Sequence, residues 1–150
     1  MKTFSYTIIT LAALMMLSSC THNEGDIDIW FGTWRVDKIE CAEKSLSEEL
    51  YDLEETLVYL QFQGDMVTVG CTNQMHDELV DYGTWTEGDG TLDISFPDSS
   101  VAYRHILGSM LASSADTFHF TITNRSASDV TLSYYNDTWD EHYTLTLSKQ

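Results

Sequence analysis

Apolar and polar residues alternate along most of the chain after Trp30, and this alternation constrains the fold more than any other feature. A period of two puts successive side chains on opposite faces of an extended backbone, so it predicts half-buried β-strands and argues against helices. Seven runs show the pattern, and the segment from Leu79 to Thr86 is expected to be an eighth strand with two mixed faces. The side chains expected to point inward are Trp34 and Val36; Val58, Leu60 and Phe62; Val67, Val69 and Cys71; Leu92, Ile94 and Phe96; Phe118, Phe120 and Ile122; Val130, Leu132 and Tyr134; and Tyr143, Leu145 and Leu147.

Short turns separate several of these strands. Turn residues occur at Gly64-Asp65, at residues 87–90 and at residues 124–129, which is typical of hairpin connections. Parallel neighbours would need crossovers of about a dozen residues or more, so the strands are expected to form an antiparallel meander. Closing the meander removes exposed edges, and eight strands enclose room for packed side chains or for one small ligand. The sequence therefore predicts an all-β, eight-stranded antiparallel up-and-down barrel.

One or two short helices interrupt the strand pattern. Ser45 and Glu48 have the spacing of a capping box, and Leu46, Leu50, Leu53 and Leu57 follow at helical spacing. The stretch from Ser100 to Ser113 predicts a second helix with one apolar face, made of Tyr103, Ile106, Leu107, Met110 and Leu111. Each helix could lie across a barrel end or pack against the outside of the sheet.

The N-terminus predicts export. One lysine, an apolar run from Phe4 to Leu17 and small residues before Cys20 are typical of a secretory signal. Leu17-Ser18-Ser19-Cys20 resembles a bacterial lipobox, which implies cleavage before Cys20 and lipidation of that cysteine. An uncleaved membrane helix is the alternative, but the apolar run is shorter than the roughly 20 residues that span a bilayer. The expected organisation is a lipoprotein signal peptide at 1–19, a lipidated tether at 20–28 and a barrel domain at 29–150.

The resemblance to a lipoprotein also predicts a location. No aspartate follows Cys20, which by the sorting rules of such lipoproteins favours the outer membrane of a Gram-negative bacterium. The periplasmic face and the cell surface both stay open.

The mature chain is strongly acidic. Removing residues 1–19 takes away Lys2, which leaves 6 basic residues against 24 acidic ones and a formal charge of −18. Such a charge argues against nucleic acid as a partner and would attract cations or cationic partners, although a solvated acidic surface that keeps an exported protein soluble is the favoured explanation.

The first strand carries a family motif. Gly32-Thr33-Trp34 follows the aromatic pair Trp30-Phe31 and resembles the Gly-x-Trp signature of lipocalins and their bacterial lipocalin-like relatives, over residues 28–149. The resemblance implies that Trp34 packs across the closed barrel end beneath a basic residue from the last strands. Arg125 and Lys149 are the basic residues there, and neither occupies the family's usual position. A second copy, Gly83-Thr84-Trp85, resembles the small bacterial members of the group.

Cys41 and Cys71 are a possible disulfide pair in an oxidising envelope. The strand from Val58 to Phe62 is expected to lie between their strands, and two interstrand spacings of about 4.8 Å exceed the usual Cα separation of a disulfide. A bridge would require Cys41 to lie on a loop, and two unbridged thiols are the equal alternative. Neither cysteine has the basic neighbours of a nucleophile.

No catalytic constellation is present in the sequence. The five histidines are scattered, no metal-binding motif occurs, and His119 is expected on the surface. Asp137, Asp140 and Glu141 surround Trp139 without the spacing of a calcium loop. We therefore expect no enzyme activity, no metal and no cofactor.

Two functions remain. The first is the binding of a small apolar or amphipathic ligand in a barrel cavity lined by Phe62, Val69, Phe96, Phe118 and Tyr134. The second is a structural or interaction role for a solidly packed barrel, whose acidic surface or Tyr135–His142 hairpin contacts another envelope protein.

Overall fold

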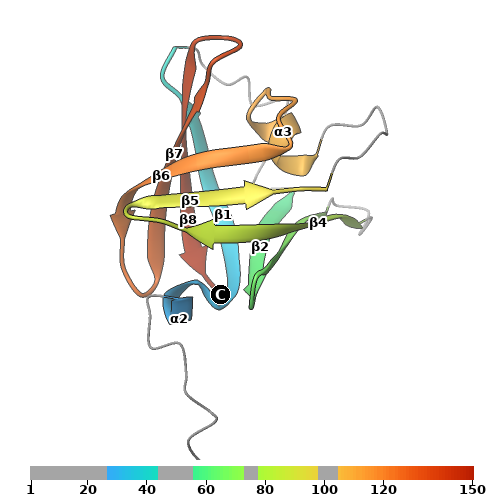
Figure 1. The fold of residues 1–150 in the computed structure, drawn as a ribbon, viewed down its shortest axis with the longest axis vertical. Helices are drawn as coiled ribbons and strands as arrows, with labels where there is room; N and C mark the ends of the chain where they lie inside the picture. The colour runs from blue at the N-terminus through green and yellow to red at the C-terminus, as the bar shows by residue number, and fades with distance from the viewer. Residues whose placement is uncertain (1–26, 44–55, 73–77, 98–104) are drawn as a thin grey trace, which may run out of the picture.

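The chain folds into a closed β-barrel in the computed structural model, which describes residues 27–43, 56–72, 78–97 and 105–150. Eight strands follow one another around the barrel in sequence order, and every neighbouring pair is antiparallel (Figure 1). The predicted fold class is confirmed. The strands are β1 (Gly32–Cys41), β2 (Leu57–Gln63), β3 (Met66–Thr72), β4 (Glu78–Glu87), β5 (Thr91–Ser95), β6 (Thr117–Arg125), β7 (Asp129–Asn136) and β8 (Glu141–Lys149).

The predicted inward side chains form the core. All are buried except Cys71 and Ile122, which are partly buried and pack against the others. Alternation gave the correct face because each strand has one side toward the barrel interior and one toward solvent. Trp30, from the short helix α2 (Ile27–Trp30), is also fully buried in this core.

The two ends of the barrel are built differently (Figure 1). The tight turns after β2, β4 and β6 meet α2 at one end, which we call the α2 end. Gly64 and Gly90 adopt positive φ values of 59° and 75° in two of these turns, a conformation that glycine reaches without steric cost. The connections after β1, β3, β5 and β7 join strand ends at the opposite end, which we call the α3 end after the helix α3 (Ile106–Met110).

Helix α3 is the described part of the helix predicted over residues 100–113. Ile106, Leu107, Met110 and Leu111 are buried, and α3 lies over the barrel end, one of the two placements that the sequence left open. Within the described ranges, no helix is long and apolar enough to cross a membrane.

Two further expectations, the helix after Ser45 and the tether before the barrel, agree only in part with the structure. The helix expected after Ser45 lies outside the described residues, apart from Leu57, and the assignment of Leu57 to that helix is wrong. Leu57 is the first residue of β2, where it pairs with Thr72 and is exposed. Helix α2 begins at Ile27, so two residues of the expected tether are helical. Cys20 and the signal segment lie outside the described residues.

Cys41 and Cys71 are free thiols in the structure. Cys41 is the last residue of β1 and Cys71 lies in β3, so β2 stands between their strands in the barrel order. Burial raises the pKa of the Cys71 thiol, which lowers its reactivity as a nucleophile.

Candidate functional site at the α3 end

The α2 end is filled by a cluster of four aromatic side chains. The ring of Trp30 lies 5.8 Å from that of Trp34 and 5.2 Å from that of Phe62, and Trp85 packs edge-on against Phe62 at 5.1 Å. The Trp34 indole N–H donates a 2.8 Å hydrogen bond to the Trp30 carbonyl, which fixes α2 across this end of the barrel. Large aromatic surfaces in tilted and edge-on contact make this end a closed floor.

Two cations cover this aromatic cluster. Lys149 Nζ lies 5.4 Å from the centre of the Trp34 ring and donates to the Ile29 carbonyl at 2.9 Å. Arg125 lies 5.9 Å over Trp30 and is paired with Glu87. Lys149 thus covers the motif tryptophan although its position in the sequence does not match the family's basic residue, because β8 ends directly beside the start of β1.

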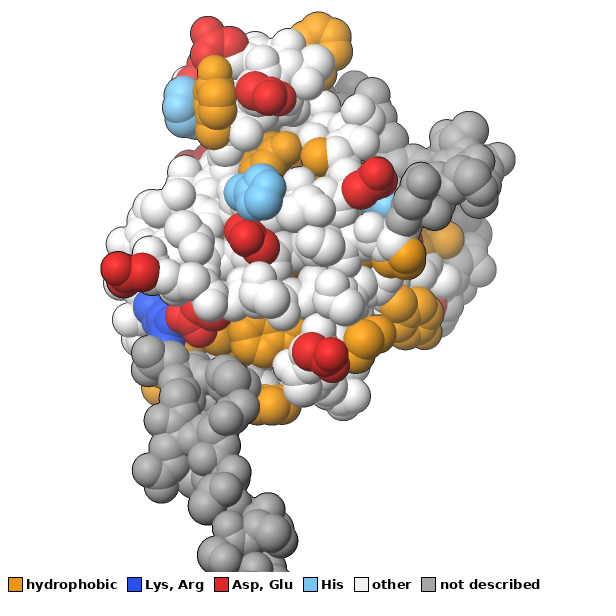
Figure 2. Space-filling view, in the orientation of Figure 1, with side chains coloured by type: hydrophobic (Ala, Val, Ile, Leu, Met, Phe, Trp, Pro, Cys, Tyr) orange, Lys and Arg blue, Asp and Glu red, His pale blue; other side chains and the backbone are white. Residues whose placement is uncertain are grey.

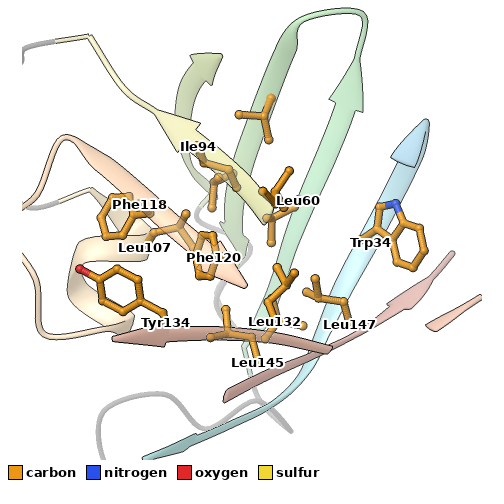
Figure 3. Packing of buried hydrophobic residues seen from close by; sticks show 14 of the residues in the cluster. Trp34, Leu60, Ile94, Leu107, Phe118, Phe120, Leu132, Tyr134, Leu145 and Leu147 are labelled. Carbon is orange, nitrogen blue, oxygen red and sulfur yellow. The ribbon is translucent and has the colours of Figure 1, made fainter. Parts of the chain in front are cut away.

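The side chains expected to line a cavity fall into separate groups (Figure 3). Phe62 belongs to the aromatic floor at the α2 end, and Val69 is fully buried on β3, which pairs with β2 and β4. Phe118 packs against Phe96 at 6.0 Å and against Tyr134 at 5.7 Å. Figure 3 shows Phe118 and Tyr134 beside Leu107 of α3, so this group lies at the α3 end, away from Trp34.

Buried polar side chains fasten α3 to the barrel. Asn136 is 1% exposed, and its amide nitrogen donates to the carbonyls of Leu111 and Ala112 at 3.0 and 3.1 Å. The Tyr134 hydroxyl donates to Ser113 Oγ at 2.9 Å. The two Asn136 bonds satisfy carbonyls just after the C-terminal end of α3, where no further helical turn follows, and the Tyr134 bond holds the Ser113 side chain beside them.

The other end of α3 meets a carboxylate from the barrel wall. Asp81 alternates with Gly83 and Trp85 on β4, and its Oδ2 accepts the backbone N–H of Ile106 at 2.6 Å. The neighbouring His105 stacks its ring on Phe96, with ring centres 4.4 Å apart and planes 19° apart. Its Nδ1 lies 3.9 Å from Asp81 Oδ1 and its Nε2 lies 3.8 Å from Asp116 Oδ1.

Two buried side-chain polar atoms lack a hydrogen-bond partner within the part of the chain that the structure describes. They are Nε2 of His105 at the α3 end and Nε1 of Trp85 in the barrel core. Buried polar atoms in folded proteins are nearly always paired with protein or water, so these two atoms are exceptions, and each carries an energetic cost. Sequence reasoning did not single out Asp81, His105 or Asn136. The one available signal was Asp81 in the strand whose two faces looked mixed.

Among the residues that the structure describes, the other titratable groups form no arrangement that indicates metal or nucleophilic chemistry. No group of three or more histidine, cysteine or acidic side chains among the described residues could hold a metal ion. His119 points outward, as expected, and its Nδ1 lies 2.9 Å from Asp93.

Comparisons with known proteins place the fold. No protein-family model and no curated protein matches the chain. Among solved structures, a lipocalin-like protein from Bacteroides uniformis aligns with a TM-score of 0.60 at 13% identity, over 81% of this chain and 99% of that one. An uncharacterized protein from Bacteroides eggerthii aligns equally well, at 11% identity and with the same coverage. The fold is therefore that of a lipocalin-like barrel.

Proposed function

We propose that the protein is a lipid-anchored binding protein of the bacterial envelope, which takes a small apolar or amphipathic molecule into the α3 end of its barrel. The observation that carries the proposal is the unpartnered, buried Nε2 of His105 beside the aromatic group of Phe96, Phe118 and Tyr134. Small-molecule sites are mostly apolar with a few placed polar groups, and this end of the barrel combines both.

The energetics favour an additional partner at this point. A buried polar atom that loses its hydrogen bond costs roughly 1–3 kcal/mol, which is a large fraction of a domain's stability. His105 Nε2 and the rings of Phe96 and Phe118 are buried, so a ligand with a polar head and an apolar body would reach them only by displacing residues of the α3 end. The filled α2 end leaves the α3 end as the entrance.

The anchor would orient this entrance away from the membrane. Seven residue steps separate Cys20 from Ile27, so an extended tether reaches at most about 25 Å. Because α2 lies at the closed end, a lipid on Cys20 holds that end nearest the bilayer, which we take to be the outer membrane of a Gram-negative bacterium. The α3 end then faces the aqueous phase on either side of that membrane.

Native mass spectrometry tests the proposal. The mature protein is released from the envelope of the producing bacterium with mild detergent, and a bound small molecule is expected as an extra mass that is lost on denaturation. His105→Phe keeps a stacked ring but removes Nε2, so it should lower the occupancy. His119→Phe is the matched control on the outer surface and should leave occupancy unchanged. An empty wild-type barrel, or equal occupancy in the two variants, would contradict the proposal.

A protein-interaction role is the second candidate, and one surface favours it. The β7–β8 hairpin exposes Tyr135 and Trp139, which are 50% and 61% accessible. Figure 2 shows hydrophobic, acidic and histidine side chains gathered over this hairpin at the top of the view. The Tyr135 hydroxyl donates to Asp140, and the His142 ring lies 4.8 Å from Tyr135, so the surface is ordered by its own contacts.

Site-specific crosslinking in the producing cells tests this second role. A photoreactive phenylalanine analogue at position 139 should give one defined adduct, and the adduct should disappear when Tyr135→Ala is added. The same analogue at Tyr82, which is equally exposed on β4, is the control. Equal adducts at both positions would indicate random collisions and reject the hairpin as a docking surface.

A further inference from the structure

We infer that the outer face of β2, β3 and β4 is an interface between two copies of this chain, which pair side by side. The inference does not depend on a ligand in the barrel. It starts from the outward side chains of these three neighbouring strands, which form rungs across the barrel wall because paired residues share a face. From the α3 end to the α2 end, the rungs are Leu57-Thr72-Glu78, Tyr59-Gly70-Val80, Gln61-Thr68-Tyr82 and Gln63-Met66-Thr84.

This face offers accessible apolar surface that is already ordered. Tyr82 is 63% exposed and Met66 is 46% exposed. The Tyr59 ring covers Gly70 so closely that a Cβ atom there would lie 2.1 Å from Cζ of the ring, and the Tyr59 hydroxyl donates to Glu78 at 2.6 Å. A ring held flat in this way loses little conformational freedom when a second surface packs on it.

The absence of charge on this face selects the partner. Of the outward side chains described on these strands up to Thr84, only Glu78 is charged, and it is bound to Tyr59 at the α3 end. The 6 basic and 24 acidic residues of the mature chain give a formal charge of −18, so two copies repel each other wherever their acidic faces meet. A neutral face with exposed apolar side chains lets two copies approach with the least repulsion, whereas a cationic partner would be drawn to the acidic surfaces instead.

A two-fold axis along β3 makes this face complementary to itself. It brings β2 of one copy opposite β4 of the other, so the amides of Gln61 and Gln63 face two hydroxyl groups. These hydroxyls belong to Tyr82 and Thr84, while Met66 lies near the axis and meets its own counterpart. Because the axis runs along the strands, the α2 ends of both copies point the same way, as the proposed anchor in one membrane requires.

The size of the face sets the affinity. Two of the three strands have 7 residues, and strands about 4.8 Å apart with a rise of about 3.3 Å per residue cover roughly 14 by 23 Å. Standard interfaces bury about 800 Å² on each partner, so this one belongs with the small and transient ones. We therefore expect a weak dimer with a Kd of about 10–100 µM, which two chains anchored in one membrane would still populate.

Sedimentation velocity tests the inference on the mature protein, solubilised in a mild detergent with micelles in large excess over protein. The wild type should show a concentration-dependent dimer, and Tyr82→Asp, which places a carboxylate in the face, should raise the Kd at least tenfold. Trp139→Asp is the matched control, because it adds the same charge at a similarly exposed aromatic residue of the β7–β8 hairpin and should leave the Kd unchanged. A wild type that stays monomeric at about 300 µM, or equal losses in the two variants, would overturn the inference.

A second variant separates contact at this face from net charge. Met66→Lys makes the chain less acidic, so net repulsion alone predicts a tighter dimer. The interface predicts a Kd at least tenfold higher, because two ammonium groups would meet near the axis. Tighter association of Met66→Lys would therefore refute this placement of the interface.

The salt dependence gives an independent readout on the wild type. Raising the salt from about 0.05 to about 0.5 M screens the repulsion between two acidic copies, so the Kd should fall severalfold. A Kd that rises with salt would indicate ion pairs between the copies and exclude this uncharged face as their contact.

Photocrosslinking in the producing cells identifies the partner. At Tyr82, the control position of the hairpin experiment, the photoreactive analogue should give an adduct of twice the mass of the chain, distinct from any adduct formed at position 139. An adduct of another mass at Tyr82 would show that a different protein covers this face, and the second copy would be rejected as its partner.

Discussion

Replacing Asn136 by alanine should release the C-terminal end of α3 from the barrel. Asn136 is almost fully buried, and its side chain makes three hydrogen bonds. Two run from Nδ2 to the carbonyls of Leu111 and Ala112, and the third runs from the Thr138 N–H to Oδ1 at 3.1 Å. Alanine removes all three hydrogen bonds and leaves a small void in place of the amide group.

The magnitude follows from the burial of the groups left behind. A typical hydrogen bond contributes about 1 kcal/mol net, and a buried group left without a partner costs about 1–3 kcal/mol. Leu111 is fully buried, while Thr138 lies in an exposed turn where water can replace the lost bond. We therefore expect Asn136→Ala to lower the free energy of unfolding by about 3 kcal/mol. With an m-value near 1.5 kcal/mol/M, the urea midpoint should fall by about 2 M.

Urea unfolding and amide hydrogen exchange measure this effect together. The amides of Ser109 and Leu111 donate to His105 and Leu107 within α3, and their exchange should accelerate more than that of the barrel strands. Asn124→Ala, at an exposed position of β6, is the matched control and should change stability by less than about 0.5 kcal/mol. If the two variants unfold at the same urea concentration, or if α3 exchanges as in the wild type, Asn136 does not hold the helix.

Two further predictions concern the barrel wall and its floor. The Tyr59 hydroxyl donates to Glu78, which raises the pKa of Tyr59 to about 12, while the unfolded chain ionises near pH 10. The unfolded state therefore loses this proton first, so the free energy of unfolding should fall between about pH 10 and pH 12. Tyr59→Phe should remove this part of the pH dependence, as measured by urea titrations over that range. An unchanged pH dependence would contradict the assignment. Lys149→Met removes the bond to Ile29 and the cation over Trp34, and should cost about 1 kcal/mol in urea unfolding. A loss below about 0.3 kcal/mol would show that the aromatic floor holds without the lysine.

Most strands were predictable because buried and exposed side chains alternate along at least part of each one. Val58, Leu60 and Phe62 follow this rule on β2, and all three are fully buried. The conformation of Leu57 was not predictable in this way, because its spacing from earlier leucines also suits a helix. In the structure, pairing with Thr72 makes it part of a strand. A local pattern cannot resolve a residue that satisfies two periodicities, and tertiary pairing then overrides it.

The candidate site was less predictable, because a period of two gives the face of a residue but not its height in the barrel. Phe62 and Phe118 both point inward, yet one belongs to the aromatic floor and the other lies beside α3. His105 and Asn136 act through contacts with residues more than twenty positions away, or through stacking that no pattern encodes. Their roles follow only from the closed barrel.

The same contacts that stabilise α3 should weaken ligand binding at the α3 end. Leu107 and Leu111 are fully buried at this end, so a ligand that enters there has to displace them, and the free energy of that displacement is subtracted from its affinity. Asn136→Ala lowers this free energy, so it should bind the ligand of the barrel more tightly although it unfolds more easily. If the full 3 kcal/mol acts on α3, the gain reaches about 100-fold, since each 1.4 kcal/mol is a factor of ten. Weaker binding by Asn136→Ala would show instead that α3 in its present position is part of the site, because only then does loosening the helix remove contacts to the ligand.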